Sequence, residues 1–224
     1  MGVASPRIVA FGGWAEDPLW DYVLGLCKGE RPRLLFVPTA SAEDPRWTLD
    51  VYERFGGRAE VSHLSFFPWP PEDLRERALG QDLIVVSGGN TANMLAVWRV
   101  HEFDAVLREA WERGVVLCGG SAGAICWFEA SVTDSFGPQL EGMRDGLGFL
   151  PGSACPHYDG EARRRPRYAE LVGGGFPPGI AIDDDAAVRF DGTEVGEVLT
   201  TREGARAYRV TAEGEEPLDA RLLA

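Results

Sequence analysis

The amino-acid sequence predicts an α/β protein with a three-layer α/β/α architecture and a mostly parallel central sheet. Short, almost continuous apolar runs alternate with predicted helices along the first half of the chain. Such runs are typical of strands that are buried on both faces of a parallel sheet. The last third changes to short alternating runs separated by turn residues, which predicts an antiparallel C-terminal extension of the same sheet.

Each predicted strand is followed by a predicted helix. The strands of the first half are expected at 7–11, 34–37, 60–64, 82–86 and 115–118. The helices are expected at about 18–27, 45–55, 71–78 and 91–113, the last broken near His101, because prolines at the starts and glycines after the ends are typical of helices. The C-terminal runs cover 180–182, 187–190, 195–200 and 205–210. Successive strand–helix units with short loops predict one doubly wound domain over residues 1–224.

Composition excludes several classes of partner. The chain has 224 residues, of which 45% are hydrophobic, enough for one sizeable core. Its formal net charge of −13 argues against nucleic acid or an anionic membrane surface as partner. No apolar run is long enough to span a bilayer, and residues 1–7 lack the order of a signal peptide. The four cysteines form no C-x-x-C pair, so we expect reduced thiols and a cytoplasmic protein.

One serine lies between glycines directly after an apolar run. Ser121 is the central residue of Gly119-Gly120-Ser121-Ala122-Gly123, which matches the Gly-x-Ser-x-Gly pattern of a nucleophile elbow. The turn from strand to helix is tight and strained there, so its neighbours must be small. It also places the hydroxyl beside free backbone N–H groups that can stabilise an anion. The pattern alone is equally compatible with a structural turn.

A serine nucleophile needs a base and a carboxylate that orients the base. Of the three histidines, His157 follows a short apolar segment that ends at a proline, which is typical of a loop at the end of a strand. His63 lies within a strand-like run and His101 interrupts a helix, which favours structural or surface roles for both. No histidine has a second ligand at metal-binding spacing, so we expect no metal site.

The orienting carboxylate stays open at this level. Three adjacent aspartates at 183–185 follow an apolar run, and alternation at the end of a strand lets only one or two of them face a crevice. An acidic, solvated turn is the alternative interpretation. The further candidates are Glu129, Asp134, Asp159 and Glu161.

Loops of small residues are expected to converge on one crevice. They are Gly12-Gly13, the loop 87–91 and the elbow, each at the carboxyl end of a predicted strand, where open α/β sheets bind ligands. A phosphate-binding role for the loop 87–91 is disfavoured, because neither of the complete glycine motifs for nucleotides is present.

The ordered set of motifs resembles peptidase E, the S51 serine peptidases, which include aspartyl dipeptidases and cyanophycinases. The matching segments run through most of the chain: 87–91, 120–124, Thr133-Asp134, 156–158 and 179–184. The histidine precedes the acid, which separates this chain from the α/β-hydrolases. The resemblance implies a fold like that of class I glutamine amidotransferases, although those enzymes need a cysteine where this chain has Ser121.

The resemblance also implies roles for individual residues. Ser121 would be the nucleophile, His157 the general base, and Asp184 the acid, at a position where the family commonly has glutamate. Asp134 matches another important acidic position and is the supporting or alternative acid. The backbone N–H groups of Gly89 and Ala122 would form the oxyanion hole, with about 3 kcal/mol of transition-state stabilisation per donor.

The resemblance implies hydrolysis of short peptides, above all dipeptides with N-terminal aspartate, without a cofactor. Arg163 in the stretch Gly-Glu-x-Arg would bind the substrate carboxylate, since a guanidinium can hold it with two hydrogen bonds. A solvated helix face is the alternative for the three arginines at 163–165. Asn90 and Thr91 are further candidates for substrate binding, and a homodimer is implied. The alternatives are hydrolysis of other acidic, cyanophycin-derived or isopeptide-linked dipeptides, and a non-catalytic binding module.

Overall fold

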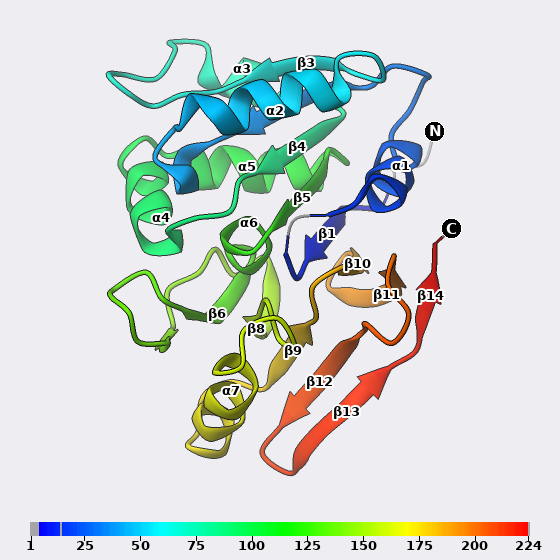
Figure 1. Cartoon of the computed structure of the whole chain (residues 1–224). Coiled ribbons are helices and arrows are strands. Elements are labelled where there is room, and N and C mark those ends of the chain that lie inside the picture. Colours follow the sequence, from blue (N-terminus) through cyan, green and yellow to red (C-terminus); the bar gives the residue numbers. More distant parts are fainter. Residues whose placement is uncertain (1–4, 14, 224) are drawn as a thin grey trace.

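A computed structural model describes residues 5–13 and 15–223, so part of the segment 1–7 and of the predicted domain range lies outside the described residues. An eight-stranded sheet occupies its centre, in the order β14-β11-β10-β1-β5-β4-β2-β3 (Figure 1). Five neighbouring strands of this sheet are mutually parallel, as predicted: β1, β5, β4, β2 and β3. Their bounds are β1 (Arg7–Phe11), β2 (Arg33–Val37), β3 (Glu60–His63), β4 (Leu83–Val86) and β5 (Val116–Gly120).

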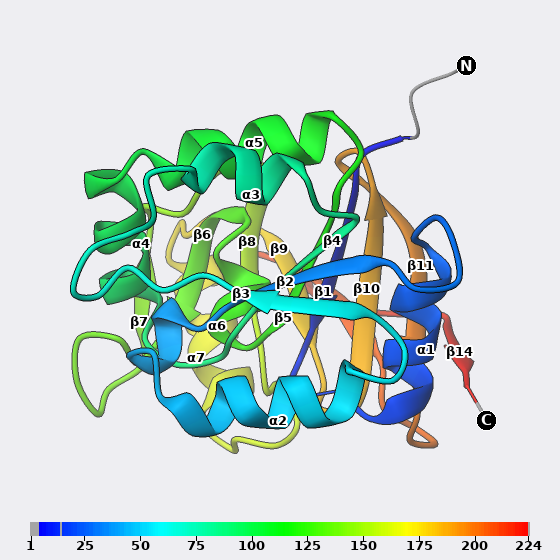
Figure 2. The same cartoon turned by 90° about the horizontal axis from the view of Figure 1, so that it is seen from above.

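Helices cover both faces of this sheet, which confirms the three-layer α/β/α architecture (Figures 1 and 2). Alternate residues of one strand point to opposite faces. In β1, Val9 and Phe11 pack with α1 and α2, whereas Ile8 and Ala10 pack with α3, α4 and α5. The helices are α1 (Asp17–Gly25), α2 (Pro45–Phe55), α3 (Leu74–Leu79), α4 (Thr91–Val100) and α5 (Phe103–Glu112), with a short 3-10 helix η1 (Thr39–Ser41).

The break predicted near His101 is present. His101 ends α4, and Glu102 takes a left-handed backbone conformation with φ of 55° before α5 begins. The prediction of one helix interrupted at this point is therefore confirmed.

The C-terminal extension is divided between two sheets, which corrects the prediction that all of it extends one sheet. Strands β10 (Ala186–Asp191) and β11 (Glu194–Thr200) do continue the central sheet antiparallel from β1, and β14 (Ala220–Leu222) ends it. The runs 180–182 and 205–210 instead become β9 (Gly179–Ile182) and β12 (Ala207–Thr211) of a second sheet. Local alternation predicts a strand but not its partner, because pairing is a tertiary contact.

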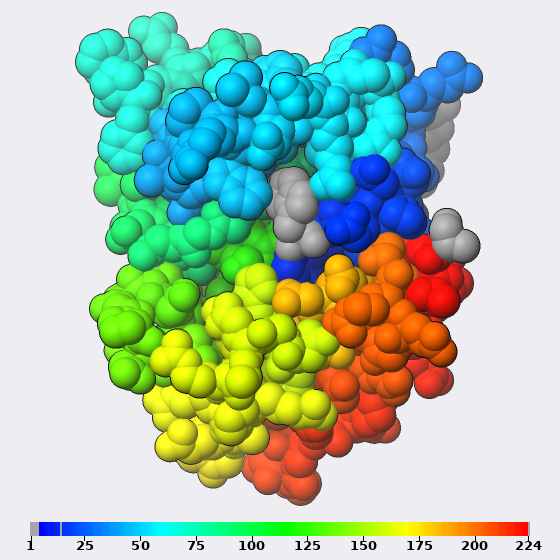
Figure 3. All heavy atoms as spheres, in the orientation of Figure 1, coloured from blue at the N-terminus to red at the C-terminus, as the bar shows by residue number. Residues whose placement is uncertain are grey.

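The second sheet has the order β13-β12-β9-β8-β6-β7 and lies below the first in Figure 1. It adds β6 (Phe128–Thr133), β7 (Glu141–Met143), β8 (Leu150–Cys155) and β13 (Gly214–Leu218), with α7 (Arg164–Gly173) packed on it. Figure 3 shows the atoms of this part filling the lower half, directly against the N-terminal half. One buried cluster includes residues of both sheets, among them Ile8 and Ile180. The single-domain organisation stays a prediction.

The helix that follows Ser121 is short. Helix α6 (Ala122–Ile125) makes a single turn, and the chain enters β6 three residues later. In that strand Val132 and Thr133, two residues that favour strands, are buried. Within the described part of the chain, the helices include none that is long and apolar enough to cross a membrane. All four cysteines are free thiols.

Candidate active site

Ser121 stands between β5 and α6 in a strained conformation. Its φ of 54° and ψ of −115° are uncommon for a residue with a side chain. Strain of this kind is concentrated at functional sites. The backbone N–H of Ser121 donates to the carbonyl of Phe11 at the end of β1, at 3.4 Å. The sequence-predicted elbow is therefore present.

The glycines of the elbow are required by close packing. A methyl group at Gly119 would lie 2.5 Å from the carbonyl oxygen of Val86, and one at Gly123 would lie 2.3 Å from the same atom. Both distances are much shorter than a van der Waals contact. Strand β5 and helix α6 can therefore approach β4 only because neither glycine has a side chain. The small residues fix the place of Ser121 above the sheet.

His157 lies on the loop after β8, as predicted. Its backbone N–H donates to the carbonyl of Gly12 at 3.1 Å, and its φ is 50°. The segment Phe11–Gly12 at the end of β1 thus binds both Ser121 and His157 through consecutive carbonyl groups. This segment brings together two residues that are far apart in the sequence.

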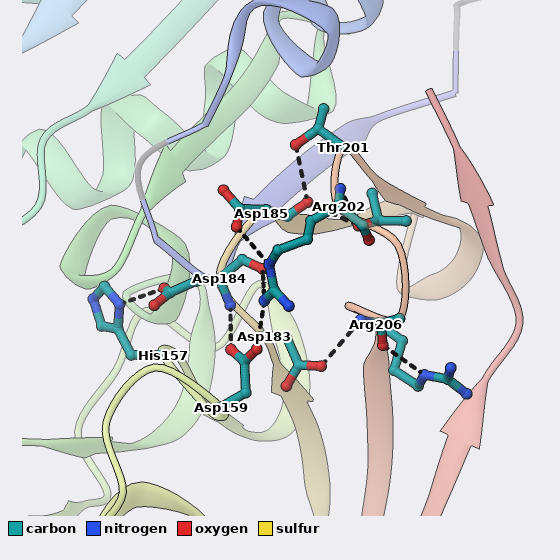
Figure 4. Close-up of polar contacts among 10 residues, drawn as sticks. His157, Asp159, Asp183, Asp184, Asp185, Thr201, Arg202 and Arg206 are labelled. Carbon is teal, nitrogen blue, oxygen red and sulfur yellow. Dashed lines mark hydrogen bonds and ion pairs between the residues drawn. The ribbon is translucent and has the colours of Figure 1, made fainter. Parts of the chain in front are cut away.

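Asp184 is the carboxylate that contacts His157. Its Oδ1 lies 2.7 Å from Nδ1 of His157 (Figure 4). A carboxylate only accepts hydrogen bonds, so Nδ1 is the donor and Nε2 is left for another partner. The two side chains are 23% and 35% exposed, which leaves the pair accessible from solvent. Among the described residues, the Ser121 hydroxyl has no hydrogen-bond partner, a common state of a nucleophile in a substrate-free site.

Two glycines enclose the Asp184 carboxylate. A methyl group at Gly160 would lie 1.9 Å from Oδ2, and one at Gly13 would lie 2.5 Å from Oδ1 and 3.4 Å from Cε1 of His157. The carboxylate therefore fills the space that two absent side chains leave. Sequence reasoning expected Gly13 in the crevice but did not single out Gly160.

The three adjacent aspartates have three different surroundings, as the alternation argument required. Asp184 faces His157, Asp185 pairs with Arg202 at 2.8 Å, and Asp183 is buried at 2% exposure. Oδ2 of Asp183 accepts the backbone N–H of Arg206 at 3.0 Å, whereas its Oδ1 has no hydrogen-bond partner among the described residues. Burial raises the pKa of Asp183 to about 6.

Asp134 lies elsewhere, at the exposed end of β6. Among residues 5–13 and 15–223, its carboxylate has no hydrogen-bond or ion-pair partner, and so none in His157. The next residue, Ser135, accepts a hydrogen bond from the Asn90 side chain at 2.9 Å. Asp134 therefore precedes a residue that is hydrogen-bonded to the loop after β4, and the structure does not pair it with His157.

The two backbone groups predicted for the oxyanion hole flank Ser121. Gly88 packs directly against its side chain, because a methyl group there would be 3.5 Å from Cβ of Ser121. Gly89 has φ of 134° and lies against the carbonyl of Ala40, so only glycine fits. Within the described residues, the N–H groups of Gly89 and Ala122 donate to no other group. Both donors are available to a ligand.

Asn90 is hydrogen-bonded within the structure, and Thr91 is buried. The Asn90 side chain accepts the N–H of Asn93 at 2.8 Å, which caps α4, and donates to Ser135. Thr91 is 1% exposed. The Asn90 side chain thus holds the loop, Thr91 is buried at the start of α4, and the predicted role of both residues in substrate binding gains no support from the structure.

The three arginines at 163–165 differ in burial. Arg163 is exposed before α7 and donates to the carbonyl of Pro138 at 3.1 Å, beside a groove of about 930 Å³. Arg164 is 3% exposed, pairs with Glu161 at 2.8 Å and donates to the carbonyl of Val132 at 3.1 Å. The alternative interpretation, in which all three arginines lie on a solvated helix face, therefore does not hold for Arg164. Arg163 makes no contact with Ser121, His157 or Asp184 in the described structure.

Sequence reasoning missed the ion-pair partner of the acidic run. Arg202 contacts Asp159, Asp185 and the carbonyl of Asp184. It lies in the turn after β11, where an exposed arginine is common and gives no signal of its own. The other two histidines have the structural surroundings predicted for them, since His63 contacts Tyr52 at 3.1 Å and His101 ends α4.

Known proteins resemble this chain over most of its length. The model of peptidase family S51 matches residues 12–198. The uncharacterized peptidase YgaJ of Bacillus subtilis (strain 168) is 46% identical over 212 residues, which cover 91% of each chain. A peptidase from an acI-B1 actinobacterium has a similar fold, with a TM-score of 0.73, 19% identity and coverage of 98% and 96%. A protein described as peptidase E from Listeria monocytogenes EGD-e has a TM-score of 0.66, 18% identity and coverage of 89% and 99%. The chain therefore belongs to peptidase family S51 and is a peptidase.

Proposed function

We propose that this peptidase hydrolyses short peptides, above all dipeptides with N-terminal aspartate, through a Ser121–His157–Asp184 triad. The observation that supports the triad best is the 2.7 Å contact between Nδ1 of His157 and Asp184. An imidazole held in this way has Nε2 free to accept the proton of a serine hydroxyl. Ser121 would then attack the peptide carbonyl and form an acyl-enzyme, which water hydrolyses in the second half of the reaction.

The strained elbow supports the rest of the mechanism. Negative charge develops on the carbonyl oxygen during attack, and within the described part of the chain the N–H groups of Gly89 and Ala122 are unpaired. Donors of this kind act most strongly when they are fixed before the reaction, and the backbone of both loops is fixed by packing. His157 would return its proton to the leaving amine.

Arg163 is the residue that would select a substrate with an N-terminal aspartate. Arg163 is exposed and lies on the loop that follows His157, so its guanidinium could turn from the Pro138 carbonyl to a substrate carboxylate. We also place the enzyme in the cytoplasm, where four free thiols persist.

A dipeptide panel on the purified protein tests activity and substrate class together. We expect hydrolysis of Asp-Leu to exceed that of Asn-Leu and Ala-Leu, because Asn is the uncharged isostere of Asp. Ser121→Ala should abolish turnover without changing the fold. Wild-type turnover in that variant would exclude Ser121 as nucleophile. An unchanged ratio of Asp-Leu to Ala-Leu hydrolysis in Arg163→Ala would exclude Arg163 as the specificity residue.

Parallel variants identify the acid. Asp184→Asn should lower kcat by about 10⁴-fold, the usual cost of an orienting acid that no longer selects the histidine tautomer. Asp134→Asn should leave kcat within about threefold of wild type, because its carboxylate has no contact with His157. The opposite result would transfer the role of the acid to Asp134.

A further inference from the structure

We propose that the ion pair between Asp159 and Arg202 positions the acid of the triad against its base. The proposal rests on the function proposed above and adds two positioning residues to it. In the described structure neither side chain forms a hydrogen bond or ion pair with Ser121 or His157, so both would act through Asp184.

The pair holds both backbone groups of Asp184. Oδ1 of Asp159 accepts the N–H of Asp184 at 2.9 Å, and Nη2 of Arg202 donates to the carbonyl of Asp184 at 3.1 Å. The same nitrogen contacts Oδ2 of Asp159, which closes a ring of contacts around one residue (Figure 4). The side chain of Asp184 is then directed at His157 from a main chain that is fixed on both sides.

The pair also connects two separate loops. Asp159 lies two residues after His157, on the loop that presents the base, and Arg202 lies on the turn after β11. Nε of Arg202 donates to the carboxylate of Asp185 at 2.8 Å. One guanidinium therefore binds both Asp184 and Asp185. The planar guanidinium binds several oxygens in fixed directions. It therefore sets the distance between the loop that carries His157 and the aspartates at 183–185.

We expect the ion pair between Asp159 and Arg202 to fix the position of Asp184 and to add little to the free energy of unfolding. The side chains of Arg202, Asp159 and Asp185 are 45%, 31% and 30% exposed, and solvent-exposed ion pairs contribute little to folding. A displacement of about 1 Å at a catalytic group, in contrast, can cost about 100-fold in rate. Loss of the pair should therefore lower kcat much more than it lowers the melting temperature.

Substitutions of Arg202 test this, with Arg75→Ala as matched control. Arg75 forms an exposed ion pair with Glu109 between α3 and α5, with exposures of 56% and 30%. We expect Arg202→Ala to lower kcat by about 10- to 100-fold with KM and Tm close to those of Arg75→Ala. Arg202→Lys should recover part of kcat, because an ammonium binds one carboxylate but lacks the fork. Adding Asp159→Asn to Arg202→Ala should cost little more, since the two act as a unit.

A second measurement does not depend on turnover. The Nδ1 proton of a histidine bonded to a carboxylate gives a far-downfield proton NMR signal, which His157→Gln would identify by its loss. Arg202→Ala should shift or broaden this signal, and Arg75→Ala should leave it in place. An unchanged signal together with wild-type kcat in Arg202→Ala would overturn the positioning role. If the wild-type protein hydrolyses no dipeptide in a Ser121-dependent way, the proposed function fails, and the NMR signal still decides the positioning role.

Discussion

Gly160→Ala should lower kcat by about 100-fold while leaving the enzyme folded. The added methyl group would lie 1.9 Å from Oδ2 of Asp184, and contacts shorter than 3.0 Å are essentially never made by real Cβ atoms. The backbone conformation of Gly160 is one that alanine also adopts, so the backbone itself is not strained by the substitution. The atom that must give way is the end of a side chain, which can rotate at small cost in stability.

The cost falls on the pair with His157. To move from 1.9 Å to at least 3.0 Å, Oδ2 must retreat by about 1.1 Å, and because Oδ1 belongs to the same rigid carboxylate, we expect its 2.7 Å contact with Nδ1 to be displaced. A misplacement of about 1 Å costs about 100-fold in rate, or about 2.7 kcal/mol of transition-state stabilisation. We therefore expect kcat to fall by about 100-fold, with the free energy of unfolding changed by less than about 1 kcal/mol.

Steady-state kinetics on the best dipeptide of the panel and thermal unfolding provide the two readouts. Gly173→Ala is the control, because Gly173 lies in α7 and a methyl group there meets nothing within 4 Å. Wild-type kcat in Gly160→Ala would show that Asp184 can move away without consequence, and it would refute the assignment of this carboxylate to the triad.

Two further predictions concern stability. Gly119→Ala should destabilise the fold by about 1–3 kcal/mol in urea unfolding, because its methyl group would meet the backbone oxygen of Val86 at 2.5 Å, whereas Gly57→Ala, which meets nothing within 4 Å, should not. Equal unfolding midpoints would contradict the close packing of the elbow. Asp183→Asn should stabilise the protein above pH 6. The pKa of Asp183 is raised in the fold from 3.8 to about 6, so the folded state binds more protons than the unfolded state between about pH 4 and 6. Wild-type stability therefore falls as pH rises through this window, and the variant avoids a cost of about 2–3 kcal/mol at pH 7. A variant that is less stable than wild type at pH 8, or one whose advantage persists at pH 4, would contradict this.

The sequence by itself determined the elements that depend on local pattern. The apolar runs at 7–11 and 82–86 predicted central strands because a strand buried on both faces has few polar residues. The small residues around Ser121 predicted the elbow for a similar reason, since close packing of strand and helix excludes side chains. The position of His157 after an apolar segment predicted a loop at a strand end. In each case the cause lies within a few residues of the effect.

Only the tertiary structure decided which distant groups meet. The residues alone left several acids open, and the resemblance implied Asp184 with Asp134 as the alternative; the fold brings Asp184 to His157 across 27 residues of sequence. The division of the C-terminal strands between two sheets, and the approach of Arg202 to Asp184, have the same origin. Strand pairing and ion pairing between remote residues depend on how the two sheets pack, and no local periodicity records that packing.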